Sequence, residues 1–415
     1  MEPAEQSFDI AIVGGGLAGA SLAAALAPLP LSIALIEAHA PDSSAQPSFD
    51  ERTTALGNAS RRAFEALGVW HHLAPEAAPI TSIHVSDAGR FGFARLDAAR
   101  FEQQALGYVV PNRVLGRELW RALAGAPRIT PFMPARLRGL QVGEAAAQLQ
   151  VELDGRATEL SARLVVAADG AQSMVRQVAG LSATVEEYGQ VAIVAALRTD
   201  QRNDGIAYER FTSAGPMALL PLRGTPGESW RTLVWAAAPA DAGGLMQLPP
   251  AQFMHEWQQA FGWRAGRALG LGTRGRYPLA LTRSAATVAP RIVLLGNAAQ
   301  SLHPVAGQGF NLALRDVATL AEMLAAADGA DIGAAEWLAG FEAGRGTDRD
   351  GVVGFTDTLV RVFGSRHPAV VAARDAGLLL FDMLPPAKRA LSRVSLGFGR
   401  QAPRLTRGLA LGTQR

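Results

Sequence analysis

A glycine-rich turn near the N-terminus constrains the fold of this chain more than any other feature. FDIAIVGGG is an apolar run typical of a buried strand, LAGASLAAALA has the small residues of a closely packed helix, and LSIALIEA is a second buried strand. Gly14, Gly16 and Gly19 mark the strand-to-helix turn, and Glu37 ends the second strand. The spacing predicts a βαβ unit that binds a dinucleotide.

Each residue of this motif has a separate physical role in such a unit. Gly14 allows the tight turn, Gly16 lets the backbone approach a pyrophosphate, and Gly19 lets the helix pack closely on the strand. The helix N-terminus attracts the phosphate charge. Glu37 is expected to accept hydrogen bonds from a ribose.

Composition excludes several other classes of protein. The 415 residues contain no cysteine, which excludes disulfides, thiolate metal sites and cysteine nucleophiles. The seven histidines lack the paired spacing of metalloproteases, so we expect no metal site. A net charge of +2 is too small to indicate nucleic-acid binding.

The N-terminal region does not read as a targeting or membrane segment. MEPAEQSFDI lacks the basic flank and apolar stretch of a signal peptide. The longest apolar run, residues 18–38, is broken by Pro28 and Pro30, which favours helix, turn and strand over a membrane span. We therefore expect a cytoplasmic protein.

The order of elements predicts an α/β fold with an α+β insert. We expect a Rossmann-like domain, an inserted antiparallel-sheet domain and a C-terminal helical segment. The inserted sheet is expected to carry one helix, at 250–262, and hairpin turns are expected at Asp87-Ala88-Gly89 and Asp154-Gly155. The predicted boundaries are 1–75, 101–183 and 279–335 for the Rossmann-like domain, 76–100 for a hairpin of the insert, 184–278 for its sheet, and 336–415 for the helical region.

A second glycine-rich stretch, GNAAQSLHPVAGQGFNLALRD, lies between the buried strand RIVLLG and a helix. Loops of this kind either punctuate the chain or bring bare backbone against a large ligand. Its glycines, amides and one histidine-proline pair are Gly296, Asn297, Gln300, His303, Pro304, Gly307, Gln308, Gly309 and Asn311.

Three charged residues are candidate ligand contacts, and for two of them the residues alone also allow a second interpretation. Arg52 precedes a helix and is either a solvated surface side chain or a ligand contact. Arg113 stands at the head of a helix. Asp169 ends a strand, where α/β sheets place ligand contacts, but it is also well placed to cap the next helix.

Three ordered motifs resemble one family. The glycine turn with Glu37, the strand-end Asp169-Gly170 followed by SMVR, and the GNAA…HP…GQGFN stretch resemble the FAD-dependent aromatic hydroxylases of the p-hydroxybenzoate hydroxylase class. Within that class, DERTTALGNASRRAFEALGVW and GPMALLPL are most similar to the ubiquinone-biosynthesis monooxygenases of the 2-polyprenyl-6-methoxyphenol hydroxylase type.

The resemblance implies a non-covalent FAD and assigns site residues. Asn297 would bond the ribityl chain or phosphate, His303 and Pro304 would pass beside the isoalloxazine ring, and the backbone from Gly307 to Gly309 would meet its pyrimidine edge. The implied catalytic residues are Arg52, His303 and Pro304. The implied cofactor-binding residues are Gly14, Gly16, Gly19, Glu37, Arg52, Arg113, Asp169, Gly296, Asn297, Pro304, Gly307, Gln308, Gly309 and Asn311.

The chain departs from the wider class at two positions. Asn297 and Gln300 stand where most members have Asp and His. Asparagine keeps an acceptor oxygen and loses the charge, so cofactor binding should survive with altered electrostatics. The ubiquinone-biosynthesis members share this variation, which marks a subgroup.

The resemblance also implies a reaction. A polyprenylated phenol would be hydroxylated with O2 through a flavin C4a-hydroperoxide, and NAD(P)H would bind transiently, since the chain has only one dinucleotide motif. Tyr188, Tyr208 and Tyr277 are candidate catalytic bases. The alternatives are hydroxylation of a soluble aromatic compound and an idle FAD-binding scaffold subunit, whereas halogenation is disfavoured because no WxWxIP stretch occurs.

The C-terminal stretch 376–415 combines apolar and basic residues. Between Ala387 and Leu396, Leu391 and Val394 alternate with basic positions at helical spacing, as in helices that lie on a membrane surface. The alternative is a helix packed on the FAD domain with a solvated basic face. The first interpretation predicts peripheral attachment to the inner membrane, with other quinone-biosynthesis enzymes as possible partners.

Overall fold

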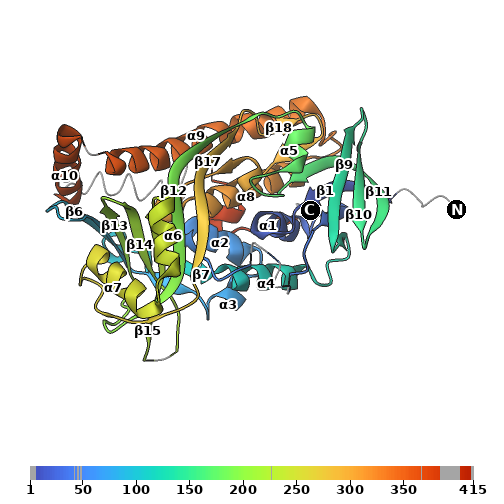
Figure 1. Ribbon diagram of the computed structural model, residues 1–415. Coiled ribbons are helices and arrows are strands. Elements are labelled where there is room, and N and C mark those ends of the chain that lie inside the picture. Colours follow the sequence, from blue (N-terminus) through green and yellow to red (C-terminus); the bar gives the residue numbers. More distant parts are fainter. Residues whose placement is uncertain are drawn as a thin grey trace.

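The computed structural model describes residues 6–41, 43, 46, 49–225, 227–365, 367–383 and 402–412. An α/β region and a β-rich region lie side by side, and the long helix α9 (Ala335–Gly364) runs along both (Figure 1). The expected fold class, an α/β domain with a β-rich insert, is confirmed.

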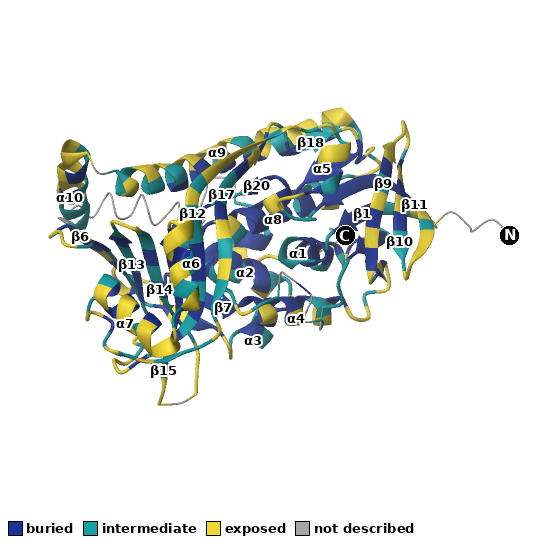
Figure 2. Ribbon diagram, in the orientation of Figure 1, coloured by how far each residue is buried: buried dark blue, intermediate teal, exposed yellow. Residues whose placement is uncertain are grey.

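The α/β region is built on a largely parallel sheet. β1 (Gln6–Val13) pairs in parallel with β2 (Ile33–Ile36) and with β11 (Arg156–Ala167). β8 (Ile129–Phe132) and β19 (Ile292–Leu294) extend the parallel part at either side. β2, β19 and the C-terminal halves of β1 and β11 are apolar and buried, so this part of the sheet is covered on both faces (Figure 2). Antiparallel strands complete it: β9 (Ala135–Val142), β10 (Ala147–Leu153) and β18 (Val288–Ala289).

Helices of small and apolar residues cover this sheet. α1 (Leu17–Leu26) follows β1 directly and packs against α4 (Asn112–Leu123) and α8 (Gly309–Ala325). The carboxyl ends of β1, β2, β11 and β19 meet at one edge of the sheet, where open α/β sheets bind their ligands.

The β-rich region is a nine-stranded sheet whose strands pair antiparallel, except for one parallel pair. β13 (Ile206–Thr212) and β5 (Ser82–Asp87) form that parallel pair. α7 (Pro250–Phe261) covers one face and buries Phe253 and Trp257 against it. The other strands are β6 (Phe93–Asp97), β12 (Ala183–Thr199), β14 (Gly215–Pro221), β15 (Ser229–Ala237), β16 (Ala268–Leu271), β17 (Gly275–Ser284) and β20 (Gln300–Ser301).

Segments that follow the first βαβ unit form a small third sheet. β7 (Gly107–Pro111) pairs antiparallel with β3 (Thr53–Gly57) and β4 (Ala78–Ile80). The short helices near it are α2 (Asn58–Ala66), α3 (Trp70–Leu73) and η1 (Ala98–Phe101).

Within the expected helical region, the described residues up to 383 form two helices, α9 and α10. α10 (Pro368–Met383) follows α9 and packs along β6, where the Arg95 backbone N–H donates to Asp382. The predicted amphipathic segment around Leu391 and Val394, with its basic neighbours, lies outside the described residues. No helix within the described ranges combines the length and the apolar character needed to cross a bilayer.

The sequence placed most elements correctly and some boundaries wrongly. Hairpins turn after β5 and after β10, as predicted. The expected boundary between residues 278 and 279 falls inside β17, which belongs wholly to the second sheet. A second helix, α6 (Pro239–Gln247), was not predicted because its two central glycines, Gly243 and Gly244, lower its helix propensity.

Candidate active site

The glycine turn between β1 and α1 is as tight as its sequence predicts. Gly14 has φ of +102°, and a Cβ there would lie 2.4 Å from the Ala168 carbonyl oxygen. A Cβ on Gly19 would lie 1.8 Å from the carbonyl oxygen of Gly14. Both positions therefore require glycine, and Gly19 brings the helix onto the turn as expected.

Glu37, which directly follows β2, binds the backbone of this turn. One carboxylate oxygen accepts a hydrogen bond of 2.6 Å from the Gly15 N–H, and the other accepts one of 2.8 Å from the His39 N–H. The side chain is buried and borders a cavity. Each oxygen retains acceptor capacity toward that cavity.

Two cavities meet at the glycine turn and share Gly16, Ala168 and Gly170. The glycine-turn cavity has a volume of about 450 Å³, and the central cavity has one of about 390 Å³. The expected site residues that line the first are Gly14, Gly16, Glu37 and Asp169. Those that line the second are Gly16, Arg52, Gly296, Asn297, Pro304 and Gly309.

One wall of the central cavity combines the two regions of the fold. The Arg52 guanidinium from the segment before β3 lies 4.5 Å from the ring centroid of Tyr277 on β17. Asp50 accepts hydrogen bonds from the Arg52 Nε at 2.7 Å and from the Tyr277 hydroxyl at 2.8 Å. Burial and the bond to Asp50 raise the pKa of Tyr277 to about 12, so this phenol stays protonated.

The loop from Gly296 to Gly309 separates the central cavity from a third one. Pro304 and Gly309 line the central cavity, whereas residues 305–308 line the other side. Ala306 and Gly307 adopt left-handed conformations, with φ of 60° and 59°. The backbone of this loop is therefore the partition between the two cavities.

The third cavity, which we call the apolar cavity, has a volume of about 410 Å³. It lies between β5, β6 and β13 of the second sheet, the loop at 305–308, and helices α9 and α10. Its aliphatic and aromatic lining comes from all of these elements, for example Ile83, Leu96, Phe211, Leu359 and Phe381. Such a lining is suited to an apolar ligand.

Comparison with known proteins gives a consistent result. Residues 7–332 match the FAD binding domain family. The chain is 38% identical to ubiquinone hydroxylase UbiL of Rhodospirillum rubrum, over 98% of this chain and 94% of that protein. It is 32% identical to 3-demethoxyubiquinol 3-hydroxylase of Escherichia coli, over 94% of this chain and 99% of that protein. The chain belongs to the FAD-dependent monooxygenases of ubiquinone biosynthesis.

Solved structures support the fold assignment. The p-nitrophenol 4-monooxygenase PnpA of Pseudomonas putida superposes with a TM-score of 0.79 at 17% identity, covering 95% of this chain and all of that one. PqsL of Pseudomonas aeruginosa, in complex with 2-aminobenzoylacetate, gives a TM-score of 0.74 at 22% identity, covering 90% of this chain and 100% of that one.

The residues of the two joined cavities fit the FAD of this monooxygenase family. The N-terminus of α1 opens through Gly16 into both cavities, as a pyrophosphate site requires. Asn297 is exposed and lines the central cavity. Asp169 borders the glycine-turn cavity, and its Oδ1 is buried with no hydrogen-bond partner among the described residues.

Asp169 caps a helix with one carboxylate oxygen and leaves the other toward a cavity, so both roles considered from the sequence, helix cap and ligand contact, are compatible with its geometry. Its Oδ2 accepts hydrogen bonds from the N–H groups of Met174 and Val175, at 2.9 and 3.3 Å, at the start of α5 (Met174–Val178). Burial raises the pKa of its carboxyl, while the backbone donors oppose that shift. Its Oδ1 remains for a ligand.

Arg113 is the expected cofactor contact with the least support from geometry. It stands at the start of α4, half exposed, with its Nε 3.6 Å from Glu51, and it lines none of the three cavities. Its role toward FAD stays a prediction.

His303 is buried behind the loop and does not line the central cavity, whereas its neighbours Leu302 and Pro304 do. The His303 Nδ1 accepts the Val305 N–H at 3.1 Å, which places the proton on Nε2, 3.3 Å from the amide oxygen of Gln190. Burial lowers the pKa of His303 to about 4. A neutral imidazole with both nitrogens engaged positions the loop, and this geometry does not favour the catalytic role expected for His303.

Asn311 and Gln308 also bind the protein itself. Asn311 accepts from the Gly57 N–H and the Ser60 hydroxyl, and it donates to the carbonyl oxygens of Ala55 and Gly307. All its hydrogen-bonding positions are thus taken, so it ties α8 to β3 and leaves nothing for FAD. Gln308 donates to the Ala306 carbonyl and faces the apolar cavity, away from the expected cofactor.

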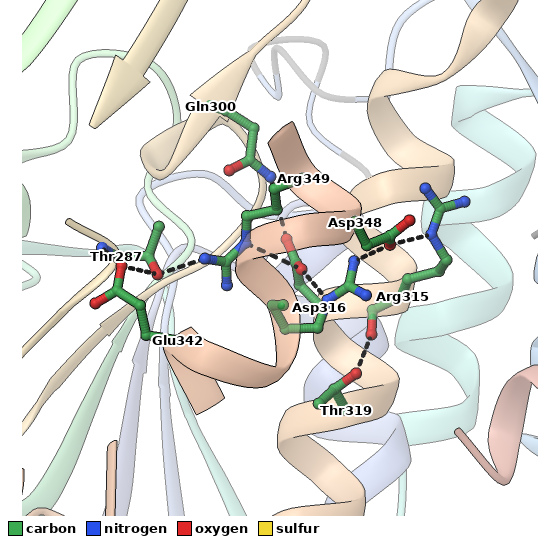
Figure 3. Close-up of polar contacts among 9 residues, drawn as sticks. Thr287, Gln300, Arg315, Asp316, Thr319, Glu342, Asp348 and Arg349 are labelled. Carbon is green, nitrogen blue, oxygen red and sulfur yellow. Dashed lines mark hydrogen bonds and ion pairs between the residues drawn. The ribbon is translucent and has the colours of Figure 1, made fainter. Parts of the chain in front are cut away.

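Gln300, one of the two departures from the wider class, connects the loop to a buried charge cluster (Figure 3). Its amide donates to Asp316 Oδ2 at 3.1 Å. Asp316 Oδ1 accepts from Arg345 Nε at 2.6 Å and from Arg349 Nε at 3.3 Å. Helices α8 and α9 are therefore held together directly behind the cofactor loop, a link that sequence reasoning missed.

The three tyrosines considered as bases all lie away from the apolar cavity. Tyr277 lines the central cavity, and Tyr188 packs edge-on against His303 at a centroid distance of 5.1 Å. Tyr208 is buried against Phe261 on the opposite face of β13. None of them lines the cavity that we assign to the substrate below.

Proposed function

We propose that the protein hydroxylates the aromatic ring of a polyprenylated phenol in ubiquinone biosynthesis, with FAD, NAD(P)H and O2. FAD would lie non-covalently along the glycine-turn and central cavities, and the phenol would occupy the apolar cavity. The observation that carries the proposal is that one loop, residues 304–309, forms a wall of both the central cavity and the apolar cavity. A ring in the apolar cavity would therefore lie next to the cofactor.

When bound, FAD supplies the reduction of O2 and the transfer of one oxygen atom to the ring, with electrons from NAD(P)H. The chain's own residues bind and orient. Gly16 and the α1 N-terminus would receive the pyrophosphate, Glu37 a ribose, and Asn297 the ribityl chain or phosphate. The aliphatic wall of the apolar cavity would exclude water and hold the ring against the loop at 305–308.

The test is oxygen incorporation with a short-chain prenylphenol. Labelled O2 should appear in the product, and the phenol should stimulate NAD(P)H oxidation. Stimulation by unprenylated phenols alone would support a soluble aromatic substrate, and FAD binding without any stimulation would support a scaffold role. Mass spectrometry of the quinone intermediates in a deletion strain would identify the pathway step.

A cavity-filling variant links this activity to the apolar cavity. Ile83→Trp places an indole in it and should abolish stimulation by the prenylphenol while the protein keeps its FAD. Val142→Trp, at a 44% exposed position on β9, is the matched control. Equal stimulation of the two variants would place the substrate elsewhere.

We also propose that the apolar cavity opens toward a membrane surface. Phe91 is 71% exposed, Phe93 41% and Leu380 57%, and they belong to the β5–β6 hairpin and the α10 helix that packs on it. The same helix contributes Leu378 and Phe381 to the cavity wall. Replacing Phe91 and Leu380 by Ser should reduce flotation with anionic liposomes without loss of FAD, and unchanged flotation would contradict this attachment.

A further inference from the structure

Among the described residues, one ionisable side chain lines the apolar cavity. Glu209 stands on β13, between Val85 of β5 and Ala218 of β14. Among the described residues, every other element around the cavity contributes only apolar side chains, backbone or an amide. The apolar neighbours include Ile83, Val85, Leu96, Phe211 and Leu359.

No partner compensates the Glu209 carboxyl within the described part of the chain. Burial alone perturbs it and raises the pKa of Glu209 to about 8. The adjacent polar residues of β13 point to the other face of the sheet, since side chains alternate along a strand. On that face the Tyr208 hydroxyl donates to the Arg264 carbonyl oxygen at 3.4 Å, and Arg210 donates to the Ser86 hydroxyl at 3.4 Å.

A carboxyl group in an apolar cavity is costly unless a ligand uses it. Glu209 bridges no elements within the described part of the chain, so no such contact there requires an acid at this position. The amide of Asn311 across the cavity is fully engaged with the protein, and Gln308 donates to a backbone carbonyl. Glu209 is therefore the group in this cavity that is best placed to exchange a proton with a bound phenol.

We propose that Glu209 accepts the proton of the substrate's ring hydroxyl and thereby activates the ring for hydroxylation. This inference rests on the proposed function. The O–H bond of the phenol breaks, the proton moves to the Glu209 carboxylate, and the electron pair stays on the ring oxygen. Electron density then rises at the ring carbon that attacks the electrophilic oxygen.

The proton balance closes after oxygen transfer. The ring carbon that gained oxygen loses its C–H proton, which restores aromaticity and compensates the negative charge left on the oxygen donor. Glu209 returns its proton to the ring oxygen. The carboxylate is thus regenerated for the next turnover.

The first experiment compares Glu209→Gln with Glu187→Gln, which makes the same chemical change at an exposed position of β12. In the wild type and in Glu187→Gln, kcat/KM for a prenylphenol should rise about tenfold per pH unit up to about pH 8. Glu209→Gln should lose this dependence and about 10²- to 10⁴-fold of the hydroxylation rate. Glu209→Asp, which keeps a carboxyl group, should retain the pH dependence.

The effect should be specific to proton transfer. Glu209→Gln should keep its FAD and still oxidise NAD(P)H, with hydrogen peroxide replacing the hydroxylated product. Hydroxylation within about threefold of the wild type, or an unchanged pH profile, would overturn the proposal.

The second experiment needs no turnover, so it separates this inference from the proposed function. Infrared difference spectra of the FAD-loaded protein between about pH 6 and about pH 10 should show loss of a protonated carboxyl band, absent in Glu209→Gln. Bound 4-nitrophenol should be more fully ionised, by its absorbance, in the wild type than in this variant. If no prenylphenol is hydroxylated but both differences appear, the proposed function fails and the proton acceptor stands. A carboxyl band that is lost well below pH 7, or equal ionisation of the bound nitrophenol, would refute Glu209 as the acceptor.

Discussion

Replacing Asp316 by Asn should strongly destabilise the protein. Asp316 has no exposed surface and accepts hydrogen bonds from two guanidinium groups, those of Arg345 and Arg349. With Arg315 and Asp348 these residues form a cluster of three arginines and two aspartates, which already carries one excess positive charge. Asparagine keeps the volume and raises that excess to two. Removal of one partner of a buried ion pair typically costs about 3–5 kcal/mol.

The assay is urea unfolding followed by far-UV circular dichroism, with Asp350→Asn as the control. Asp350 lies on the same helix, α9, and pairs with Arg283 at the surface, where both side chains are more than half exposed. Such pairs contribute about 0–1 kcal/mol. If the two variants differ by less than about 1 kcal/mol, the cluster does not stabilise α8 against α9 and the reasoning is wrong.

A double variant locates the cause of that loss. Arg349→Met in the Asp316→Asn protein removes the guanidinium that loses its ion-pair partner in that variant, and it should recover part of the stability, whereas independent sites would show additive losses. The Asp316→Asn protein should also retain less FAD than the wild type, and the double variant should regain part of that loss. The reason is that Asp316 also anchors Gln300 in the cofactor loop.

Three further outcomes are expected. Gly16→Val should abolish flavin absorbance in the purified protein, because the side chain would occupy the space that both cofactor cavities share; retained absorbance would refute the placement. Asn297→Leu should lose about 1–3 kcal/mol of FAD binding by fluorescence titration while Asn297→Asp keeps it, and equal affinities would remove Asn297 from the site. His303 binds its proton more weakly in the folded state than in the unfolded state, so stability should fall by up to about 3 kcal/mol as the pH drops from about 6.5 to about 4. His303→Gln should lack that part of the pH dependence, and an unchanged unfolding profile would contradict the assignment.

The cofactor half of the site could be predicted because its constraints are local. Gly14 adopts the left-handed conformation of the turn and Gly19 lies against the Gly14 carbonyl oxygen, both inside one βαβ unit, and Glu37 follows at a spacing that the length of α1 and β2 determines. Asn297 and Pro304 lie in one continuous loop, so their shared cavity follows from their neighbourhood in the chain. Patterns of this length are visible in a single sequence.

The parts that were wrong or missed depend on pairs distant in the sequence. Asn311 belongs to the same motif as Asn297, yet its partners, Gly57 and Ser60, come from a segment about 250 residues earlier, and they turn a presumed cofactor contact into a structural link. The contact of Gln300 with a charge cluster could not be predicted from the sequence, because Arg345 and Arg349 lie on the later helix α9.

Glu209 shows most clearly why the substrate half could not be predicted. In the sequence it lies in IAYERFT, with a tyrosine and an arginine beside it, and an alternating strand with a charged residue usually turns that residue to water. Here one face of the strand packs on α7, and the loop at 305–308 with helices α9 and α10 closes over the other. The residue expected to be solvated is therefore half-buried in the cavity wall, and helices encoded some 150 residues later contribute to the burial that raises the pKa of Glu209. A proton acceptor of this kind is created by tertiary structure, so only the assembled cavity reveals it.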